Sequence, residues 1–293
     1  MEQRPFGTTG LNVSVLGLGA SHIGNQHVSE DEAGRFLNEV LDLGVTLVDT
    51  ARGYGMSEER IGRHIAHRRG DYVLSSKCGY SIPGTEDWTP ECIHHGINNA
   101  LWLMKTDYID IMHFHSCPLD TLRRDDVVAA LLRAVDEGKV RVAAYSGENE
   151  PRQYAINSGR FRSIQTSVNI CDQRVIDEAL PLCVDGGLGV IAKRPIANAF
   201  WRFTDRPTGD YSEVYWDRAK AMGLTSGGLP WSEFALRFTA FLPGVHSCIV
   251  GTANMKHFKD NLGIVAKGPL PADLVQTTRD LFHQYGKEWE GQV

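Results

Sequence analysis

The stretch Val45-Thr46-Leu47-Val48-Asp49-Thr50-Ala51-Arg52-Gly53-Tyr54-Gly55 decides the fold, because its apolar run ends abruptly in polar residues. The stretches Tyr72–Lys77 and Ile109–His115 repeat this arrangement. Short apolar runs without alternation are typical of strands that are buried on both faces of a parallel sheet. We therefore predict three parallel strands, each of which ends in or just before a chemically active side chain.

Eight such runs occur along the chain, and amphipathic segments separate them. Parallel strands need a crossover between them, usually a helix, so this alternation predicts parallel pairing. We expect a (β/α)₈ TIM barrel, and a doubly wound open sheet is the competing arrangement. Gly44, Gly138 and Gly186-Gly187 each follow a predicted helix, where a left-handed cap is expected. The predicted strands are Ser14–Gly19, Val45–Asp49, Tyr72–Lys77, Ile109–His115, Val140–Tyr145, Ser163–Val168, Gly189–Lys193 and Ser247–Val250. The predicted helices include Asp31–Leu43, Glu58–His67, Pro90–Met104, Asp125–Glu137, Arg174–Val184 and Pro230–Phe241.

Three segments lie outside this repeat. Residues 1–12 resemble a short hairpin that would plug the bottom of the barrel, and Ala272–Tyr285 would form a closing helix. Residues 194–229 form a long loop rich in aromatic residues, which favours a lid. No linker or low-complexity stretch interrupts the chain, so residues 1–293 are predicted to form a single domain.

Composition limits the classes of function. The chain has 293 residues, 42% of them hydrophobic and 23% charged, which is typical of a globular protein with a sizeable core. A net charge of −6 argues against a nucleic-acid-binding surface. The six cysteines form no CxxC pair and indicate reduced thiols. We see neither a signal peptide nor a membrane span, and we expect a cytoplasmic protein.

A carboxylate, a phenol, an amine and an imidazole follow three successive predicted strands: Asp49, Tyr54, Lys77 and His115. In a parallel barrel these strand ends share one face, so the four side chains would meet in one pocket. A tyrosine becomes a useful acid when a cation lies nearby, and Lys77 would supply that charge while Asp49 holds it in place. His115 would donate a hydrogen bond to a carbonyl oxygen. The group contains no hydride donor, so a redox reaction would require a cofactor.

The stretch Asp49-Thr50-Ala51-Arg52-Gly53-Tyr54-Gly55-Met56-Ser57-Glu58 resembles the aldo-keto reductase pattern D-T-A-x-x-Y-G-x-S-E. Lys77 and His115 fall where that family has the remaining members of its catalytic tetrad, and residues 6–19 and 250–262 are also similar. The resemblance covers essentially the whole chain. It implies a (β/α)₈ barrel that uses NADPH or NADH to reduce an aldehyde or ketone, such as a sugar, or to oxidise the alcohol, with Tyr54 as general acid and base.

The resemblance also implies a cofactor site. Ser146 and Gln165 would face the nicotinamide carboxamide, and Lys193 and Arg194 would suit the pyrophosphate. Helix N-termini after the last barrel strands commonly bind phosphate. NADP(H) is expected, with NAD(H) as the alternative, because His257 replaces a frequent arginine, Lys193 a frequent stacking tyrosine and Gly147 a frequent asparagine. The predicted contacts after the last strand are Gly251, Thr252, His257, Asp260 and Asn261.

The sequence is also compatible with a function of a different class. A regulatory subunit that binds nicotinamide and reports redox state with little turnover is the main alternative. A metal is not expected, because His113-Phe114-His115 lacks further ligands in a recognisable pattern. The glycines of Gly17–Gly24 do not match the spacing of a dinucleotide-binding fold. We expect a small-molecule partner and neither a nucleic acid nor a membrane; the substrate, the direction and the oligomeric state are left open.

Overall fold

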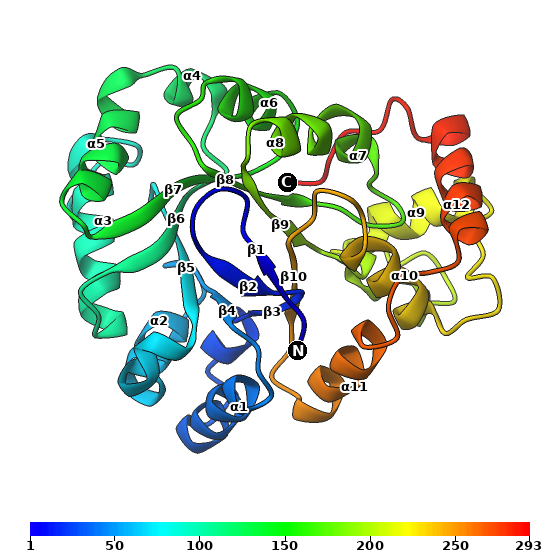
Figure 1. The fold of residues 1–293 in the computed structure, drawn as a ribbon, viewed down its shortest axis with the longest axis horizontal. Helices are drawn as coiled ribbons and strands as arrows, with labels where there is room; N and C mark the ends of the chain where they lie inside the picture. Colours follow the sequence, from blue (N-terminus) through cyan, green and yellow to red (C-terminus); the bar gives the residue numbers. More distant parts are fainter.

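In the computed structural model, which describes residues 1–293, eight parallel strands close into a barrel (Figure 1). Each strand pairs in parallel with the next one along the chain, and the last pairs with the first. The closed sheet confirms the TIM barrel and rules out the open sheet. Its strands are β3 (Leu16–Gly19), β4 (Leu47–Asp49), β5 (Val73–Cys78), β6 (Ile109–His115), β7 (Val140–Ser146), β8 (Ser163–Ser167), β9 (Gly189–Lys193) and β10 (Ser247–Gly251).

Helices surround this barrel in a ring (Figure 1). None of them is long and apolar enough to cross a bilayer. The α-helices are α1 (Glu30–Asp42), α2 (Ser57–His64), α3 (Pro90–Met104), α4 (Leu119–Leu122), α5 (Asp125–Asp136), α6 (Asn149–Asn157), α7 (Arg174–Glu178), α8 (Leu180–Asp185), α9 (Glu213–Ala221), α10 (Trp231–Ala240), α11 (Met255–Val265) and α12 (Ala272–Tyr285). The 3₁₀ helices are η1 (His22–Gly24), η2 (Ala66–Asp71) and η3 (Ala197–Arg202).

Local sequence explains where several helices begin and end. Ser29 and Glu32 form a reciprocal capping box at the start of α1, and the Thr89 hydroxyl accepts from the Cys92 amide at the start of α3. Gly44, Gly138 and Gly187 have φ values of 82°, 74° and 64°, as expected for left-handed caps. Gly186 instead keeps helical geometry.

The N-terminal hairpin closes one end of the barrel. Strands β1 (Gln3–Pro5) and β2 (Asn12–Ser14) pair antiparallel and lie across the barrel in Figure 1. Phe6, Leu11 and Val13 form a separate apolar cluster with residues of five barrel strands, and Phe6 is fully buried. The predicted plug is therefore present, and the opposite end of the barrel stays open for chemistry.

Two segments differ from the predicted elements. Arg174–Val184 contains two short helices, α7 and α8, with a break at Ala179. Pro181 has no amide hydrogen and lies in the first turn of α8, where none is needed. Residues 194–229 are not an unstructured loop, because they contain η3 and α9.

The Asp110 side chain links η2, β5 and β7 through hydrogen bonds. Its buried carboxylate accepts hydrogen bonds from Arg69 (2.6 Å), Arg141 (2.8 Å) and the Leu74 amide (2.8 Å). We expect Asp110→Ala to lower the free energy of unfolding by about 3 kcal/mol, because the buried Leu74 amide and the partly buried Arg69 lose their acceptor. Urea unfolding measures this change. Asp107→Ala, which removes an exposed carboxylate, should change stability by less than about 0.5 kcal/mol; equal effects would contradict the prediction.

Candidate active site

A buried ion pair joins the ends of β4 and β5. Lys77 Nζ donates to Asp49 Oδ2 at 2.6 Å and to the Thr50 carbonyl at 2.8 Å. The other Asp49 oxygen accepts from Ser75 Oγ at 2.7 Å and from Gln165 Nε2 at 2.8 Å. The Lys77 and Asp49 side chains are each 1% exposed. This network fixes both charges in position.

Each partner of this pair keeps the other one charged. Burial favours the neutral forms, but the Asp49 carboxylate holds the pKa of Lys77 above its ordinary value. Burial would likewise raise the pKa of Asp49, and the Lys77 cation lowers it instead. An ammonium group is therefore maintained inside the barrel mouth at neutral pH.

Tyr54 and His115 lie next to this ammonium group. Lys77 Nζ is 4.9 Å from the centroid of the Tyr54 ring, and the Tyr54 and His115 rings meet edge to face with centroids 6.1 Å apart. Burial, together with the nearby Lys77 cation, lowers the pKa of His115 to about 3. His115 is therefore neutral at pH 7, and one of its ring nitrogens carries a proton.

The second imidazole of the strand, His113, points into the core. It is fully buried, its Nδ1 lies 3.3 Å from the Ser76 carbonyl, and burial lowers its pKa to about 3. The structure contains no group of three or more His, Cys, Asp or Glu side chains that could hold a metal ion.

The four predicted catalytic residues line one cavity of about 590 Å³ at the open end of the barrel. Five of the predicted cofactor contacts line it too: Ser146, Gln165, Lys193, Arg194 and Gly251. The other four lie just outside its lining, in the loop after β10 or in the first two turns of α11: Thr252, His257, Asp260 and Asn261.

The basic residues near this cavity have acidic partners. Lys193 Nζ lies 3.1 Å from the buried Glu148 carboxylate. Lys256 pairs with Asp260 at 2.9 Å, and Lys259 pairs with Glu39 at 2.5 Å. Arg194 differs from these lysines, because it hydrogen-bonds only neutral oxygens, among them Ser167 Oγ at 3.1 Å and the Tyr211 hydroxyl. Arg194 therefore forms no salt bridge within the protein, and its positive charge is available to a ligand.

The segment after α12 returns to the mouth of the barrel. The Asn149 side-chain amide exchanges two hydrogen bonds with the Gly291 backbone, at 2.8 and 3.1 Å. The Gln292 backbone N–H donates to Asp172 Oδ2 at 3.1 Å, and the Gln292 backbone carbonyl accepts from Arg194. Val293 then lines the cavity.

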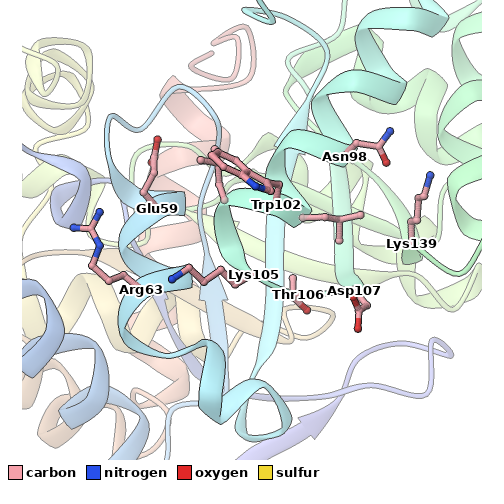
Figure 2. A pocket seen from close by; sticks show the side chains of 10 residues that line it. Glu59, Arg63, Asn98, Trp102, Lys105, Thr106, Asp107 and Lys139 are labelled. Atoms are coloured by element: carbon pink, nitrogen blue, oxygen red, sulfur yellow. The ribbon is translucent and has the colours of Figure 1, made fainter.

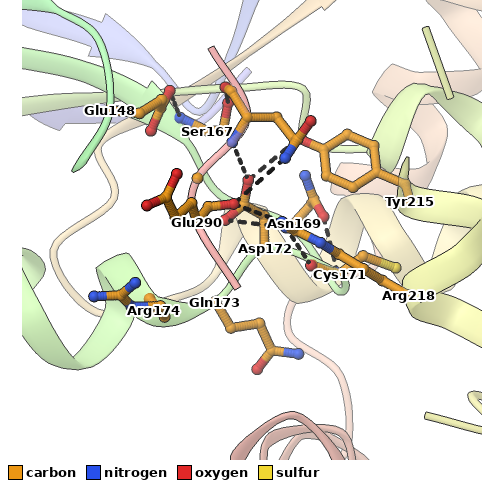
Figure 3. Close-up of polar contacts among 12 residues, drawn as sticks. Glu148, Ser167, Asn169, Cys171, Asp172, Gln173, Arg174, Tyr215, Arg218 and Glu290 are labelled. Atoms are coloured by element: carbon orange, nitrogen blue, oxygen red, sulfur yellow. Dashed lines mark hydrogen bonds and ion pairs between the residues drawn. The ribbon is translucent and has the colours of Figure 1, made fainter. Parts of the chain in front are cut away.

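Asp172 is the centre of the network that anchors this segment (Figure 3). Tyr215 Oη donates to it at 3.3 Å, and Arg218 lies 3.8 Å away and donates to the Glu290 carbonyl at 2.5 Å. Burial, with help from the nearby Glu148 carboxylate, raises the pKa of Asp172 to about 6. The anchor is thus a set of buried polar groups rather than an apolar contact.

Residues 194–229, which were predicted to form a lid, are packed through their aromatic side chains and line one side of the cavity. Trp201 stacks on Trp231 with centroids 5.9 Å apart, and the Trp216 indole donates to the Phe203 carbonyl at 3.2 Å. Tyr215 is buried, whereas Tyr211 is 69% exposed and lines the cavity. None of the three loop tryptophans, Trp88, Trp201 and Trp216, lines the cavity, so they act in packing.

Several residues of the cavity are not among those predicted from the sequence. His22 follows β3, Tyr211 lies in the long loop, and Val293 comes from the far end of the chain. Tyr80, which hydrogen-bonds His115 at 2.7 Å, was missed as well. Tyr80 follows the end of β5 by two residues, and this position beyond a strand end was the one signal that could have identified it.

A second hollow, of about 720 Å³, lies outside the barrel between α2 and α3 (Figure 2). Exposed side chains such as Trp102 and Lys105 line it, together with Asp107. It contains no residue from a strand end and no member of the buried ion pair. The barrel mouth is therefore the candidate active site.

Residues 15–281 match the model of the Aldo/keto reductase family. The chain belongs to this family. A solved aldo-keto reductase from Bacillus halodurans in its holo form superposes with a TM-score of 0.81, at 27% identity, over 96% of each chain. Two relatives are L-galactose dehydrogenase of Arabidopsis thaliana (26% identical; 91% of this chain, 89% of the relative) and NADH-specific methylglyoxal reductase of Escherichia coli (28% identical; 83% of each). This aldo/keto reductase is an NAD(P)H-dependent oxidoreductase of carbonyl compounds and alcohols.

The mouth of this aldo/keto reductase fits a nicotinamide cofactor. Gly19 and Gly251 lie side by side on paired strands and add no side chain of their own, and the His22 ring lies against Gly251. The first turn of α11 contains no acidic residue, so the N-terminal end of this helix favours phosphate, although the Asn254 side chain already accepts from the His257 amide. Arg194 adds positive charge, and Ser146 and Gln165 supply a hydroxyl and an amide. These donors match the charges and polar groups of NAD(P)H.

Glu58 lies beneath the site, in the first turn of α2. One of its oxygens accepts from Ser76 Oγ at 2.7 Å, and the other is buried without a partner. Burial raises the pKa of Glu58 from 4.5 to about 7. The folded protein therefore holds this proton more tightly than the unfolded chain does.

Glu58→Gln should remove a pH dependence of stability. Between about pH 4.5 and 7 the unfolded chain ionises Glu58 while the folded protein does not, so wild-type stability falls as pH rises. Relative to wild type, Glu58→Gln should gain up to about 3 kcal/mol across this interval. Denaturant unfolding of both proteins from pH 4.5 to 8 measures the difference. The exposed-site control Glu91→Gln should track wild type, and a parallel course for Glu58→Gln would refute the assignment.

Proposed function

We propose that this aldo/keto reductase interconverts an aldehyde or ketone and its alcohol, with Tyr54 as the group that transfers the proton. The observation that carries the proposal is the buried Asp49–Lys77 pair beside the Tyr54 ring, at the floor of the mouth cavity. No other cavity of comparable size contains an ionised pair of this kind next to a hydroxyl group.

Ser146, Gln165 and Arg194 would hold NAD(P)H, which when bound would supply or accept the hydride. Tyr54 gives its proton to the carbonyl oxygen, and Lys77 stabilises the negative charge that is left on the phenol oxygen. Asp49 keeps Lys77 protonated and fixes its position through the 2.6 Å hydrogen bond. Neutral His115 donates a hydrogen bond to the same carbonyl oxygen and so orients the substrate.

Ser146 and Gln165 are proposed to bind the nicotinamide carboxamide, since both line the cavity next to Asp49. Lys193 and Arg194 would face the pyrophosphate, with Arg194 as the stronger contact because Glu148 already pairs with Lys193. Gly251, Thr252, His257, Asp260 and Asn261 would bind the adenosine end. We propose NADP(H) as the cofactor, with NAD(H) as the alternative.

The substrate is proposed to be a small polar carbonyl compound such as a sugar. Asn198, Arg202 and Tyr211 line one side of the cavity, so several polar side chains are available to the substrate. The sugar dehydrogenase of Arabidopsis thaliana among the relatives supports this class. A volume of about 590 Å³ would be shared between the nicotinamide and the substrate, which favours a small molecule.

Tyr54→Phe tests the proposal. With NADPH bound, a mixed panel of aldehydes, ketones and sugars should be reduced by wild type at least about 100-fold faster than by Tyr54→Phe, because only the proton donor is lost. Loss of nicotinamide absorbance in a single turnover measures the rate, and fluorescence titration should give the same cofactor Kd for both proteins. Equal rates would remove Tyr54 from this role. Tight cofactor binding without reduction of any carbonyl would favour the redox-reporting subunit.

His257→Arg tests the proposed adenosine end of the site. His257 is exposed in the first turn of α11, and a guanidinium group there would add a permanent positive charge. We expect the Kd for NADPH to fall several-fold while the Kd for NADH stays unchanged, because only NADPH carries the 2′-phosphate. The control His95→Arg, on the exposed side of α3, should alter neither constant; an equal change for both cofactors would contradict the assignment.

A further inference from the structure

Tyr80 contacts His115, a tetrad residue that has no hydrogen bond to the buried ion pair. Its hydroxyl oxygen lies 2.7 Å from Nδ1 of His115. The two rings also stack, with centroids 5.3 Å apart and planes 22° from parallel. Tyr80 belongs to the segment between β5 and α3, whereas His115 ends β6, so the contact joins two different elements at the mouth.

The position of Tyr80 is itself fixed. Gly79, with φ of 135°, accepts a hydrogen bond from the Trp88 amide at 2.7 Å, and a side chain at Gly79 would collide with the Trp88 ring at 2.2 Å. The Trp88 ring packs edge-on against both Tyr80 and Phe114, with centroids 6.0 and 5.9 Å away. The phenol is therefore held at His115 before any ligand binds.

Both groups of this contact are neutral, which limits where its protons can lie. Neutral His115 has one N–H and one bare nitrogen. Burial raises the pKa of Tyr80 and keeps its phenol protonated, and His115 is the only hydrogen-bond partner of its hydroxyl in the protein. When Tyr80 donates to Nδ1, the imidazole proton must reside on Nε2. His115 Nε2 has no protein partner, and His115 lines the cavity, so Nε2 is the nitrogen left for a ligand.

We infer that Tyr80 is a positioning residue that fixes His115 as the Nε2–H tautomer and orients that N–H toward the substrate oxygen. This inference rests on the proposed function for its catalytic meaning, but its structural part stands on the Tyr80–His115 contact alone. In the other tautomer a bare Nε2 would face the carbonyl oxygen, and two acceptors would repel each other. Tyr80 itself does not line the cavity, so it acts through His115.

Tyr80→Phe tests the inference, because it keeps the stacked ring and removes only the hydroxyl. Two-bond ¹H–¹⁵N spectra of ¹⁵N-labelled holoprotein report the tautomer, and His115 is assigned by its missing signals in His115→Gln. We expect the Nε2–H form in wild type and a mixture of both tautomers in Tyr80→Phe. The kcat should fall about 10-fold in the variant, with the cofactor Kd unchanged. Tyr154→Phe, a matched change on α6, should keep the wild-type tautomer and kcat.

Three results would overturn the inference: an Nδ1–H tautomer in wild type, an unchanged tautomer in Tyr80→Phe, or an unchanged kcat in that variant. The wild-type spectrum decides the first of these even if Tyr80→Phe does not fold. A protein that reduces no carbonyl would undermine the proposed function, yet its spectrum would still report the tautomer. Failure of the proposed function and failure of the inference are therefore distinguishable.

Discussion

The structure of the site depends on placing one positive and one negative charge where water hardly reaches them. Asp49 and Lys77 are each stable there only because the other is 2.6 Å away and because Ser75, Gln165 and the Thr50 carbonyl satisfy their remaining hydrogen bonds. These groups come from β4, β5 and β8 and the turn after β4, which only a closed barrel brings together. The ion pair can therefore form only in the closed barrel. It places a positive charge, that of Lys77, beside the phenol of Tyr54.

Around this pair the mouth combines residues of two kinds. Strand ends supply fixed groups with defined protonation, whereas the walls come from segments between strands, such as the turn that carries Tyr80 and the wall that carries Tyr211. Phe6 and the hairpin fill the opposite end. Packing and chemistry therefore occupy opposite ends of the barrel, so the loops at the mouth can differ in sequence without disturbing the plug.

The strands and the four central residues were predictable because their signals are local. The predicted boundaries of the eight barrel strands lie within two residues of the observed ones. Asp49, Tyr54, Lys77 and His115 each stand at or shortly after the end of an apolar run. Glu148, Asp172 and Arg218 were not identified as one network, because buried polar contacts between distant segments leave no periodic pattern. The α9 helix was missed because its aromatic residues Tyr215 and Trp216, together with Gly227-Gly228 further along the segment, suggested a loop.

The segment after α12 connects the end of the described chain to positions 142 and 120 residues earlier, through Asn149–Gly291 and Asp172–Gln292. Asn149 and Asp172 are held in these positions by the folded barrel, so residues 290–293 take their places only when the barrel is folded. The wall beside Arg194, to which the Gln292 carbonyl and Val293 contribute, is therefore ordered only while the barrel is intact.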